Sequence, residues 1–494
     1  MKLYPIFPLV ITQCFTSCSS VQGPEDSPSI LIIHTDEHNF RTLGCYRKLL
    51  PENQAFVWGK GINVETPNID FLAQNGVTFT KFYASTPVSS PSRASFVSGR
   101  YPQHTGVTTN DVPMDDKIVT FAEVFSQHGY STGYAGKWHL DGPGRPQWTP
   151  VRKFGFTDNK YMFNRGHWKK LAETTNGPEV ASIGQNGLPD YKLNGADEQS
   201  FTTDFLTERA IRFIRQNNPK ATGKPFCFML SFPDPHDPDV VRQPYDTIYR
   251  GLPFEAPVSY DIPEEEVPRW AKEDIECSID QSQYFGMVKC IDDNVGKILQ
   301  YLKDNNLLQN TIIVFTSDHG DMRAEHHRQN KGIPFEASAK IPFVVYYPAK
   351  IKAGSFVDNS FSTVDFAPSI LKLAGFDYPA SMQGRDFSPL MEKSEDQKKW
   401  DDITIIRSTG LGKNGSWIAA ITSRYKLVLS KGETPWLLDL EKDPFELTNH
   451  ISIIENDAVV KQLAAKLQQY NLKFNDPYLK ETNMESDMIQ LLAE

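Results

Sequence analysis

The chain has little of what marks a nucleic-acid-binding protein. Its 494 residues carry 51 lysines and arginines against 61 aspartates and glutamates, a formal net charge of −10. No long block of one charge sign and no repeat or low-complexity tract interrupts the sequence. This pattern argues against nucleic acid as a partner. An anionic substrate would have to find its positive charge in a few lysines, arginines or a metal ion.

Cysteine is also scarce, with six in the whole chain. Two of them, Cys14 and Cys18, lie close to the N-terminus, and the other four are Cys45, Cys227, Cys277 and Cys290. The spacing of these four fits neither a zinc site nor a dense disulfide framework. One disulfide is allowed and none is required.

Apolar runs long enough to span a bilayer are missing. The first residues, MKLYPIFPLVITQCFTSCSS, combine Lys2, a short apolar run and a small polar ending, which is typical of a secretory signal. The ending FTSC resembles a bacterial lipoprotein box with Cys18 as the lipidated residue, and the alternative is ordinary cleavage that leaves Cys18 an idle thiol. We predict a signal peptide over 1–18, export to the periplasm or cell surface of a bacterium, and membrane attachment only through a lipid on Cys18.

What the chain does have is a set of continuous apolar runs of strand length. They are SILIIHT (29–35), FCFMLSF (226–232), TIIVFTS (311–317) and IPFVVYY (341–347). Continuous rather than alternating apolar residues indicate strands buried on both faces, as in a parallel sheet.

Helical patterns with clear ends lie between these runs. Thr66 and Gly76 bound one, Thr120 and Glu123 form a capping box for another, and 282–306 is long and amphipathic. Strands alternating with helices predict a large doubly wound α/β domain with a mixed or parallel sheet.

Near residue 385 the pattern changes. A charged linker (392–402) precedes shorter alternating strands and a final helix. We predict the α/β domain over 27–390 and a smaller C-terminal α+β domain with an antiparallel sheet over 396–494.

Three of the predicted strands end in acidic and histidine residues. The residues at these ends are Asp36, Glu37, His38, Asp234, His236, Asp318, His319 and Asp321. Ligands bind at the carboxyl ends of strands in open α/β sheets, so these groups predict a metal site with acid–base groups beside it. Carboxylate-rich ligation favours Ca²⁺ or Mg²⁺, whereas zinc would need a second histidine such as His38 or His236.

The stretch STPVSSPSRASFVSGR (85–100) predicts a short helix. Ser90 can cap it, Pro91 suits its first turn and Gly99 ends it. Ser89 would then stand just before a helix N-terminus, where an anion is favoured, and Arg93 lies one turn further on. The alternative is that Ser89 and Ser90 are only capping residues.

Two further stretches hold candidate residues. In GYAGKWHL (133–140), Lys137 and His139 are two residues apart and would share one face of an extended segment, where they can hold an anion and move a proton. The alternative is a surface lysine beside a packed tryptophan. In FNRGHWKK, a polar insertion, His167 either touches a sugar or belongs to a structural loop. His326 and His327 rim the pocket at most, and we place none of these last three histidines in the catalytic set.

Together these stretches resemble the sulfatase family of the alkaline-phosphatase-like superfamily. SSPSRASFVSGR matches the C/S-x-P-S-R motif and the following T/S-G-R of that family. GYSTGYAGKWHL, FTSDHGDMRAEH with Lys331, and DLEKDPFEL fall in the order and spacing of the family. The resemblance covers nearly all of the chain after the leader.

The resemblance implies an enzyme that hydrolyses sulfate monoesters with a Cα-formylglycine made from Ser89. A serine at this position implies a radical-SAM maturase that acts before export. One Ca²⁺, with Mg²⁺ as the less favoured ion, would be bound by Asp36, Asp318, His319 and the modified Ser89, and Glu37 departs from the commoner Asp or Gln. Of the remaining residues, Arg93 and Lys137 would steady the aldehyde hydrate, His139 would take a proton from it, and Lys331 and His236 would hold the sulfate and the leaving oxygen.

The chemistry of the ester agrees with this assignment. A plain serine would be left as a stable sulfate ester, whereas a geminal diol can release sulfate by collapsing to the aldehyde. His236 would be the general acid. Export and the polar insertions favour a sulfated glycan, of glycosaminoglycan or mucin type, as substrate. The alternatives are a phosphomonoesterase or phosphonate hydrolase on the same scaffold, and a catalytically silent glycan-binding lipoprotein.

Overall fold

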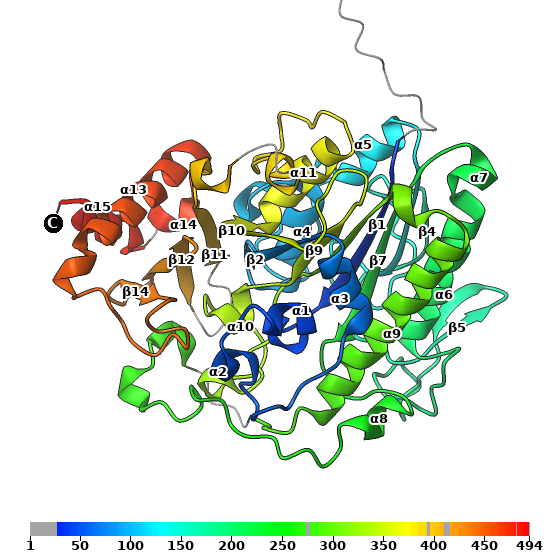
Figure 1. The fold of residues 1–494 in the computed structure, drawn as a ribbon, viewed down its shortest axis with the longest axis horizontal. Coiled ribbons are helices and arrows are strands. Elements are labelled where there is room, and N and C mark those ends of the chain that lie inside the picture. The colour runs from blue at the N-terminus through cyan, green and yellow to red at the C-terminus, as the bar shows by residue number, and fades with distance from the viewer. Residues whose placement is uncertain (1–26, 273–276, 393–395, 410–414, 481, 494) are drawn as a thin grey trace, which may run out of the picture.

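The computed structural model describes residues 27–272, 277–392, 396–409, 415–480 and 482–493, so the predicted signal peptide and Cys18 lie outside the described residues. Its centre is an eight-stranded sheet in the order β10-β2-β9-β8-β1-β7-β3-β4 (Figure 1). The strands of this sheet are β1 (Ser29–Asp36), β2 (Val77–Tyr83), β3 (Ser131–Lys137), β4 (Asp158–Phe163), β7 (Phe226–Pro235), β8 (Thr311–Ser317), β9 (Phe343–Tyr346) and β10 (Ser355–Ser362).

The four apolar runs all form strands of this sheet. β8, β1, β7, β3 and β4 are neighbours and run parallel. The run at 341–347 is a strand only over Phe343–Tyr346, and β9 is antiparallel to both β8 and β2. The expectation of parallel pairing is wrong for this run. A continuous run of apolar residues indicates a strand that is buried on both faces, but it does not indicate the direction of that strand. The sheet is therefore mixed.

Helices cover both faces of the sheet. The long ones are α3 (Pro67–Gln74), α4 (Ser89–Ser98), α5 (Phe121–Gln127), α6 (Thr202–Asn217), α9 (Ser282–Asp304) and α11 (Phe366–Leu373). The short ones are α1 (Gly44–Arg47), α2 (Glu52–Ala55), α7 (Pro219–Thr222), α8 (Tyr245–Ile248), α10 (Glu336–Ala339) and α12 (Ser388–Met391).

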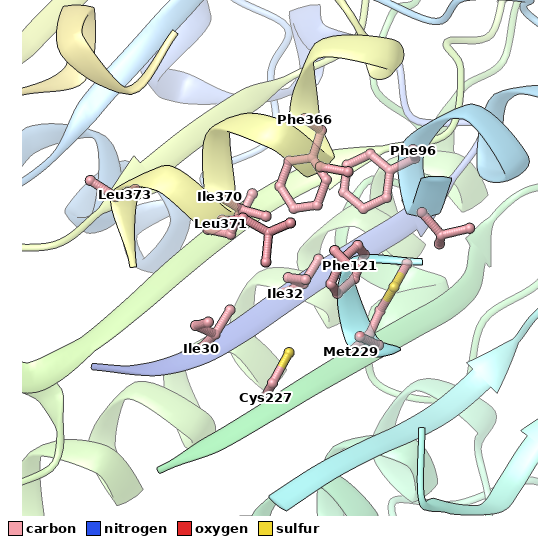
Figure 2. Packing of buried hydrophobic residues seen from close by; sticks show 14 of the residues in the cluster. Ile30, Ile32, Phe96, Phe121, Cys227, Met229, Phe366, Ile370, Leu371 and Leu373 are labelled. Carbon is pink, nitrogen blue, oxygen red and sulfur yellow. The ribbon is translucent and has the colours of Figure 1, made fainter. Parts of the chain in front are cut away.

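Alternate residues of β1 show how the two layers divide. Ile30 and Ile32 pack with Phe96 of α4, Phe121 of α5 and Ile370 of α11 (Figure 2). Leu31 and Ile33 point to the other face, where they pack with side chains of α3, α6 and α9. This is the doubly wound arrangement predicted from the sequence.

The predicted helix ends are largely confirmed. Thr66 is the N-cap residue of α3, and Thr120 and Glu123 form the expected capping box at α5. The amphipathic segment at 282–306 is α9.

A second sheet lies in the C-terminal part of the chain. It is antiparallel, in the order β11 (Thr404–Thr409), β12 (Ser416–Ile421), β13 (Tyr425–Ser430), β14 (Trp436–Asp439). Helices α13 (Asp457–Phe474), α14 (Pro477–Lys480) and α15 (Met484–Ala493) pack on one face. The other face, with Trp417, packs on α10 and its neighbours in the large domain (Figure 1).

Two further observations concern the predictions on membranes and cysteine. In the part of the chain that the structure describes, no helix has the length and hydropathy needed to cross a membrane. The side chains of Cys45, Cys227 and Cys290 are buried free thiols.

A small hairpin of β5 (Leu171–Thr174) and β6 (Gly177–Val180) forms a separate two-stranded sheet.

Candidate functional site

The carboxyl ends of four parallel strands meet at one edge of the large sheet. The buried side chains gathered there are Asp36 at the end of β1 and Glu37 after it, Asp318 and His319 after β8, Lys137 at the end of β3, and His236 after β7. Parallel pairing of β8, β1, β7 and β3 brings these distant segments together (Figure 1).

Ser89 faces this edge from the start of α4. Its Oγ lies 3.0 Å from His319 Nε2 and 3.5 Å from Asp36 Oδ1. The prediction that Ser90 caps the helix is wrong, because α4 already begins at Ser89 and Val88 is the N-cap residue. The Ser90 hydroxyl instead donates to the backbone carbonyl of His139, 2.7 Å away. Gly99 ends the helix with φ 64°, as predicted.

Three side chains around Ser89 form a candidate cation site. Ligand atoms of Asp36, Asp318 and His319 all lie within 4.8 Å of one another, and the three residues are fully buried. Two carboxylates and one imidazole at this spacing suit a divalent cation. Glu37 Oε1 is buried and has no hydrogen-bond partner among the described residues. Such an orphaned carboxylate oxygen beside the group fits the presence of a cation.

Two cations neutralise Asp36 on its other side. Lys137 Nζ donates a very short hydrogen bond to Asp36 Oδ2, and Arg93 Nη2 lies 3.6 Å from the same oxygen. Burial opposes ionisation of Asp36, but Lys137 and Arg93 hold its pKa well below the usual range. Arg93 also donates from Nε to Asp318 Oδ2 at 2.9 Å, whereas its Nη2 is buried without a hydrogen-bond partner among the described residues.

Glu37 belongs to a second group of charges. Its Oε2 lies 2.7 Å from Lys331 Nζ and 2.8 Å from His236 Nε2. Burial alone would lower the pKa of His236, but the Glu37 carboxylate raises it to about 9. Glu37, His236 and Asp237 form a second group whose ligand-type atoms all lie within 4.8 Å of one another. Glu37 thus stands between the candidate cation site and the two residues predicted to hold sulfate and the leaving oxygen.

His139 lies at the site for a reason other than the one predicted. The strand ends at Lys137, and His139 takes a left-handed φ of 62°, so the two residues do not share a face of one extended segment. The imidazole is buried, both of its nitrogens lack a hydrogen-bond partner among the described residues, and Nε2 lies 3.5 Å from Asp111 Oδ1. Burial, with Lys137 and Arg93, lowers its pKa well below the usual value.

His167 is the residue that sequence reasoning left out. Its ring stacks on His236 with centroids 3.5 Å apart, and its Nε2 lies 2.9 Å from Lys137 Nζ. Burial, then His236 and Lys137, lower its pKa well below the usual value. The polar insertion was the only signal for it, because the strand that precedes it, β4, was not among the predicted apolar runs.

The other histidines considered lie elsewhere. His326 stacks on Phe335, and His327 stacks on Tyr260. His38 contacts the hydroxyls of Thr35 and Thr42 and is absent from the candidate cation groups found among the described residues, so it does not supply the second histidine that zinc would need.

Two strand-end carboxylates serve the loops around the site. Asp234 pairs with Lys169 at 2.7 Å, and Asp321 accepts from the backbone N–H groups of Arg323 and Asn330. Because these carboxylates lie at strand ends, the sequence correctly predicted the edge of the sheet at which they lie, but it did not predict their partners.

Comparison with known protein families agrees with this arrangement. The family model for sulfatases matches residues 28–376, and the model described as N-sulphoglucosamine sulphohydrolase, C-terminal, matches residues 324–473. The first match includes Ser89 and all strand ends described above.

Individual proteins show the same likeness. An ulvan-active sulfatase of Formosa agariphila is 28% identical over 98% of this chain and 91% of its own length. An N-acetylglucosamine-6-O-sulfatase of Bacteroides thetaiotaomicron is 26% identical over 94% of this chain and 90% of its own. The crystal structure of a yidJ protein from Bacteroides fragilis superimposes with a TM-score of 0.75 and 25% identity, covering 94% of this chain and 99% of that one.

Proposed function

The chain belongs to the sulfatase family and is a sulfuric ester hydrolase, and on that basis we propose that its substrate is a sulfated carbohydrate. The observation that carries the proposal is the environment of Ser89. Its hydroxyl stands at a helix N-terminus beside a candidate cation site, and buried nitrogens of Arg93 and His139 close by have no hydrogen-bond partner among the described residues. A sulfate group supplies the acceptors that these buried donors lack.

Ser89 would act after conversion to Cα-formylglycine. The hydrated aldehyde supplies a nucleophile whose second hydroxyl permits release of sulfate, which a plain serine does not. Sulfatases use this group, and the sequence SSPSRASFVSGR around Ser89 fits it. The serine-type position implies maturation by a radical-SAM enzyme before export, with the predicted lipid on Cys18 as the membrane attachment.

Asp36, Asp318, His319 and the modified Ser89 would hold one Ca²⁺. A bound divalent cation supplies charge stabilisation for the sulfuryl oxygens. The chain's own part is to fix the ligands. Asp318 Oδ1 accepts from the backbone N–H groups of Glu37 at 3.1 Å and of His319 at 2.9 Å, which orients its carboxylate. Glu37 Oε1 is the further oxygen available to the cation.

The basic residues would hold the sulfate and move protons. Arg93 and Lys137 are buried cations and Lys331 is a partly exposed one, and all three would stabilise negative charge on the sulfuryl oxygens. His236, charged and hydrogen-bonded to Glu37, would protonate the leaving oxygen. His139, which burial keeps neutral and whose nitrogens have no hydrogen-bond partner within the described part of the chain, would accept the proton from the nucleophile.

Mass spectrometry and a substrate panel test the proposal. The peptide containing Ser89, from protein made in a host with a serine-type maturase, should be lighter by about two mass units because oxidation removes two hydrogens. That protein should hydrolyse at least one of the 3-, 4- or 6-sulfated hexoses or hexosamines or a 2-sulfated uronate, and lose this activity to a calcium chelator. Protein without the modification should be inactive. Activity on phosphate or phosphonate esters alone would refute the proposal.

A further inference from the structure

One short insertion reaches the proton-transfer groups of the site from outside the sheet. Residues 164–170 follow β4, and their anchor is Lys169, which is fully buried. Lys169 Nζ lies 2.7 Å from Asp234 Oδ1 and 3.2 Å from the backbone carbonyl of His236. A buried ion pair breaks only at high cost, so the insertion has a fixed position relative to β7.

This anchor places the ring of His167 beside two aromatic groups. One face stacks on His236, with an interplanar angle of 21° and centroids 3.5 Å apart. Tyr191 lies 5.8 Å from the His167 ring at an angle of 36°. A side chain held in this way has little rotational freedom left to lose.

The His167 ring also has a specific polar contact. Lys137 Nζ donates to His167 Nε2 at 2.9 Å while it also donates to Asp36 Oδ2. These two acceptors fix the direction of the ammonium group. His167 therefore contacts two residues that the proposed reaction uses, one through a hydrogen bond and one through ring stacking.

We propose that His167 is a positioning residue of the reaction, which aims Lys137 at the sulfate and holds the His236 imidazole toward the leaving oxygen. The inference rests on the proposed function. The inference assigns two contributions to His167, one through Lys137 and one through His236, and they affect substrates differently. Lys137 acts on the sulfuryl oxygens of every substrate. His236 matters only where the leaving oxygen needs a proton, as a sugar alcohol does and a nitrophenolate does not.

The first test compares two leaving groups. In His167→Ala we expect kcat on the sugar sulfate to fall about 100-fold, and kcat on 4-nitrophenyl sulfate to fall no more than about 10-fold, because general acid catalysis serves only the first. KM for either should change less than kcat. His128→Ala, at an exposed histidine of α5's C-terminal end, is the matched control and should leave both rates unchanged.

Two conservative variants separate the contacts. His167→Phe keeps a ring to stack on His236 but removes the acceptor for Lys137, so both substrates should slow to a similar extent. His167→Gln keeps an acceptor for Lys137 but removes the stack, so only the sugar sulfate should slow, by about 10-fold or more. Equal losses on the two substrates in all three variants would mean a structural role and overturn the inference, as would rates equal to those of the wild type.

A crystal structure gives a readout without activity. In His167→Ala the His236 ring should occupy more than one rotamer or leave its position beside Glu37. A His236 ring and Lys137 ammonium that remain in place would overturn the inference. If the wild type hydrolyses neither class of ester, the proposed function fails, and this crystallographic comparison still decides the positioning role.

Discussion

Two clusters of buried charge in this molecule have opposite characters. The catalytic-edge cluster contains Asp36, Glu37, Lys137 and His139, which lie at or just after the ends of parallel strands, together with Arg93 of α4. The seam cluster contains Tyr83, Glu336, Lys340, Lys426 and Glu446, where the second sheet meets the large domain.

The polar atoms of the two clusters differ in how many partners they have. In the seam cluster, Lys426 Nζ contacts the carbonyl of Pro334 and the carboxylates of Glu336 and Glu446, at 2.6, 3.2 and 2.7 Å. The seam side chains are absent from the buried polar atoms without a partner among the described residues, whereas Glu37, Arg93 and His139 each contribute at least one. A fully partnered cluster leaves no polar atom for a ligand to satisfy, whereas an incompletely partnered one leaves buried donors and acceptors that a ligand can satisfy.

The largest effect expected from this contrast is on activity. Ser89→Ala removes the group that becomes the nucleophile, so hydrolysis of the sugar sulfate should fall to the background rate. The melting temperature should stay within about 2 °C of the wild type, because Ser89 is buried but the substitution removes only one hydroxyl, whose partners Asp36 and His319 belong to the candidate site. A kinetic assay and a thermal melt on the same preparation check both parts. Residual turnover above background would contradict the role of Ser89.

The seam cluster should show the reverse. Lys426→Met leaves Glu336 and Glu446 buried without their shared cation, so the free energy of unfolding should fall by about 3–5 kcal/mol. The kcat of the folded fraction should not change. Denaturant unfolding measures the first quantity, and Lys426→Met combined with Glu446→Gln should recover part of the loss. A lower kcat with an unchanged free energy of unfolding would contradict the assignment of a structural role to the seam cluster.

The free energy of unfolding should depend on pH because of His326, a buried neutral histidine near the seam cluster. Burial lowers the pKa of His326 to about 3 from 6.5. The unfolded chain therefore binds one proton more than the folded chain between these pH values, and stability falls as the pH drops below 6.5. At pH 5 the loss from this residue is about 2 kcal/mol. The slope of unfolding free energy against pH should flatten in His326→Gln, and an unchanged slope would contradict the assignment.

A partly exposed ion pair should contribute least. Lys289 and Asp293 are four residues apart on α9, with Nζ 2.6 Å from Oδ1. Lys289→Gln should lower the free energy of unfolding by no more than about 0.5 kcal/mol, because solvent screens the pair. Denaturant unfolding at low and high salt measures this loss. A loss as large as that of Lys426→Met would show that an ion pair contributes the same stability whether or not it is buried.

Several features of the site could be predicted from local sequence. Asp36, Asp318 and His319 follow apolar strands, and strand ends in a parallel sheet share an edge, so their meeting follows from the pattern. The helix at Ser89 has Pro91 near its start and Gly99 at its end, and both signals were correct. The cap assignment to Ser90 was two residues too late, because the N-cap residue is Val88, which makes no side-chain capping hydrogen bond and so leaves no capping signal in the sequence.

Contacts that cross between segments could not be predicted in this way. His167 comes from an insertion after β4, and its stack on His236 depends on the Lys169–Asp234 pair. Glu37 likewise pairs with Lys331, which lies nearly three hundred positions away in the sequence.

Local periodicity and spacing were enough to predict which residue types stand at the strand ends, where α3, α5 and α9 lie, and the sulfatase motif around Ser89. The direction of β9, the placement of His167 beside Lys137 and His236, and the difference between the two charge clusters depend on contacts between distant segments and became known from the tertiary structure. Whether a buried charge has a partner depends on side chains far apart in the chain, and no local pattern records that distance.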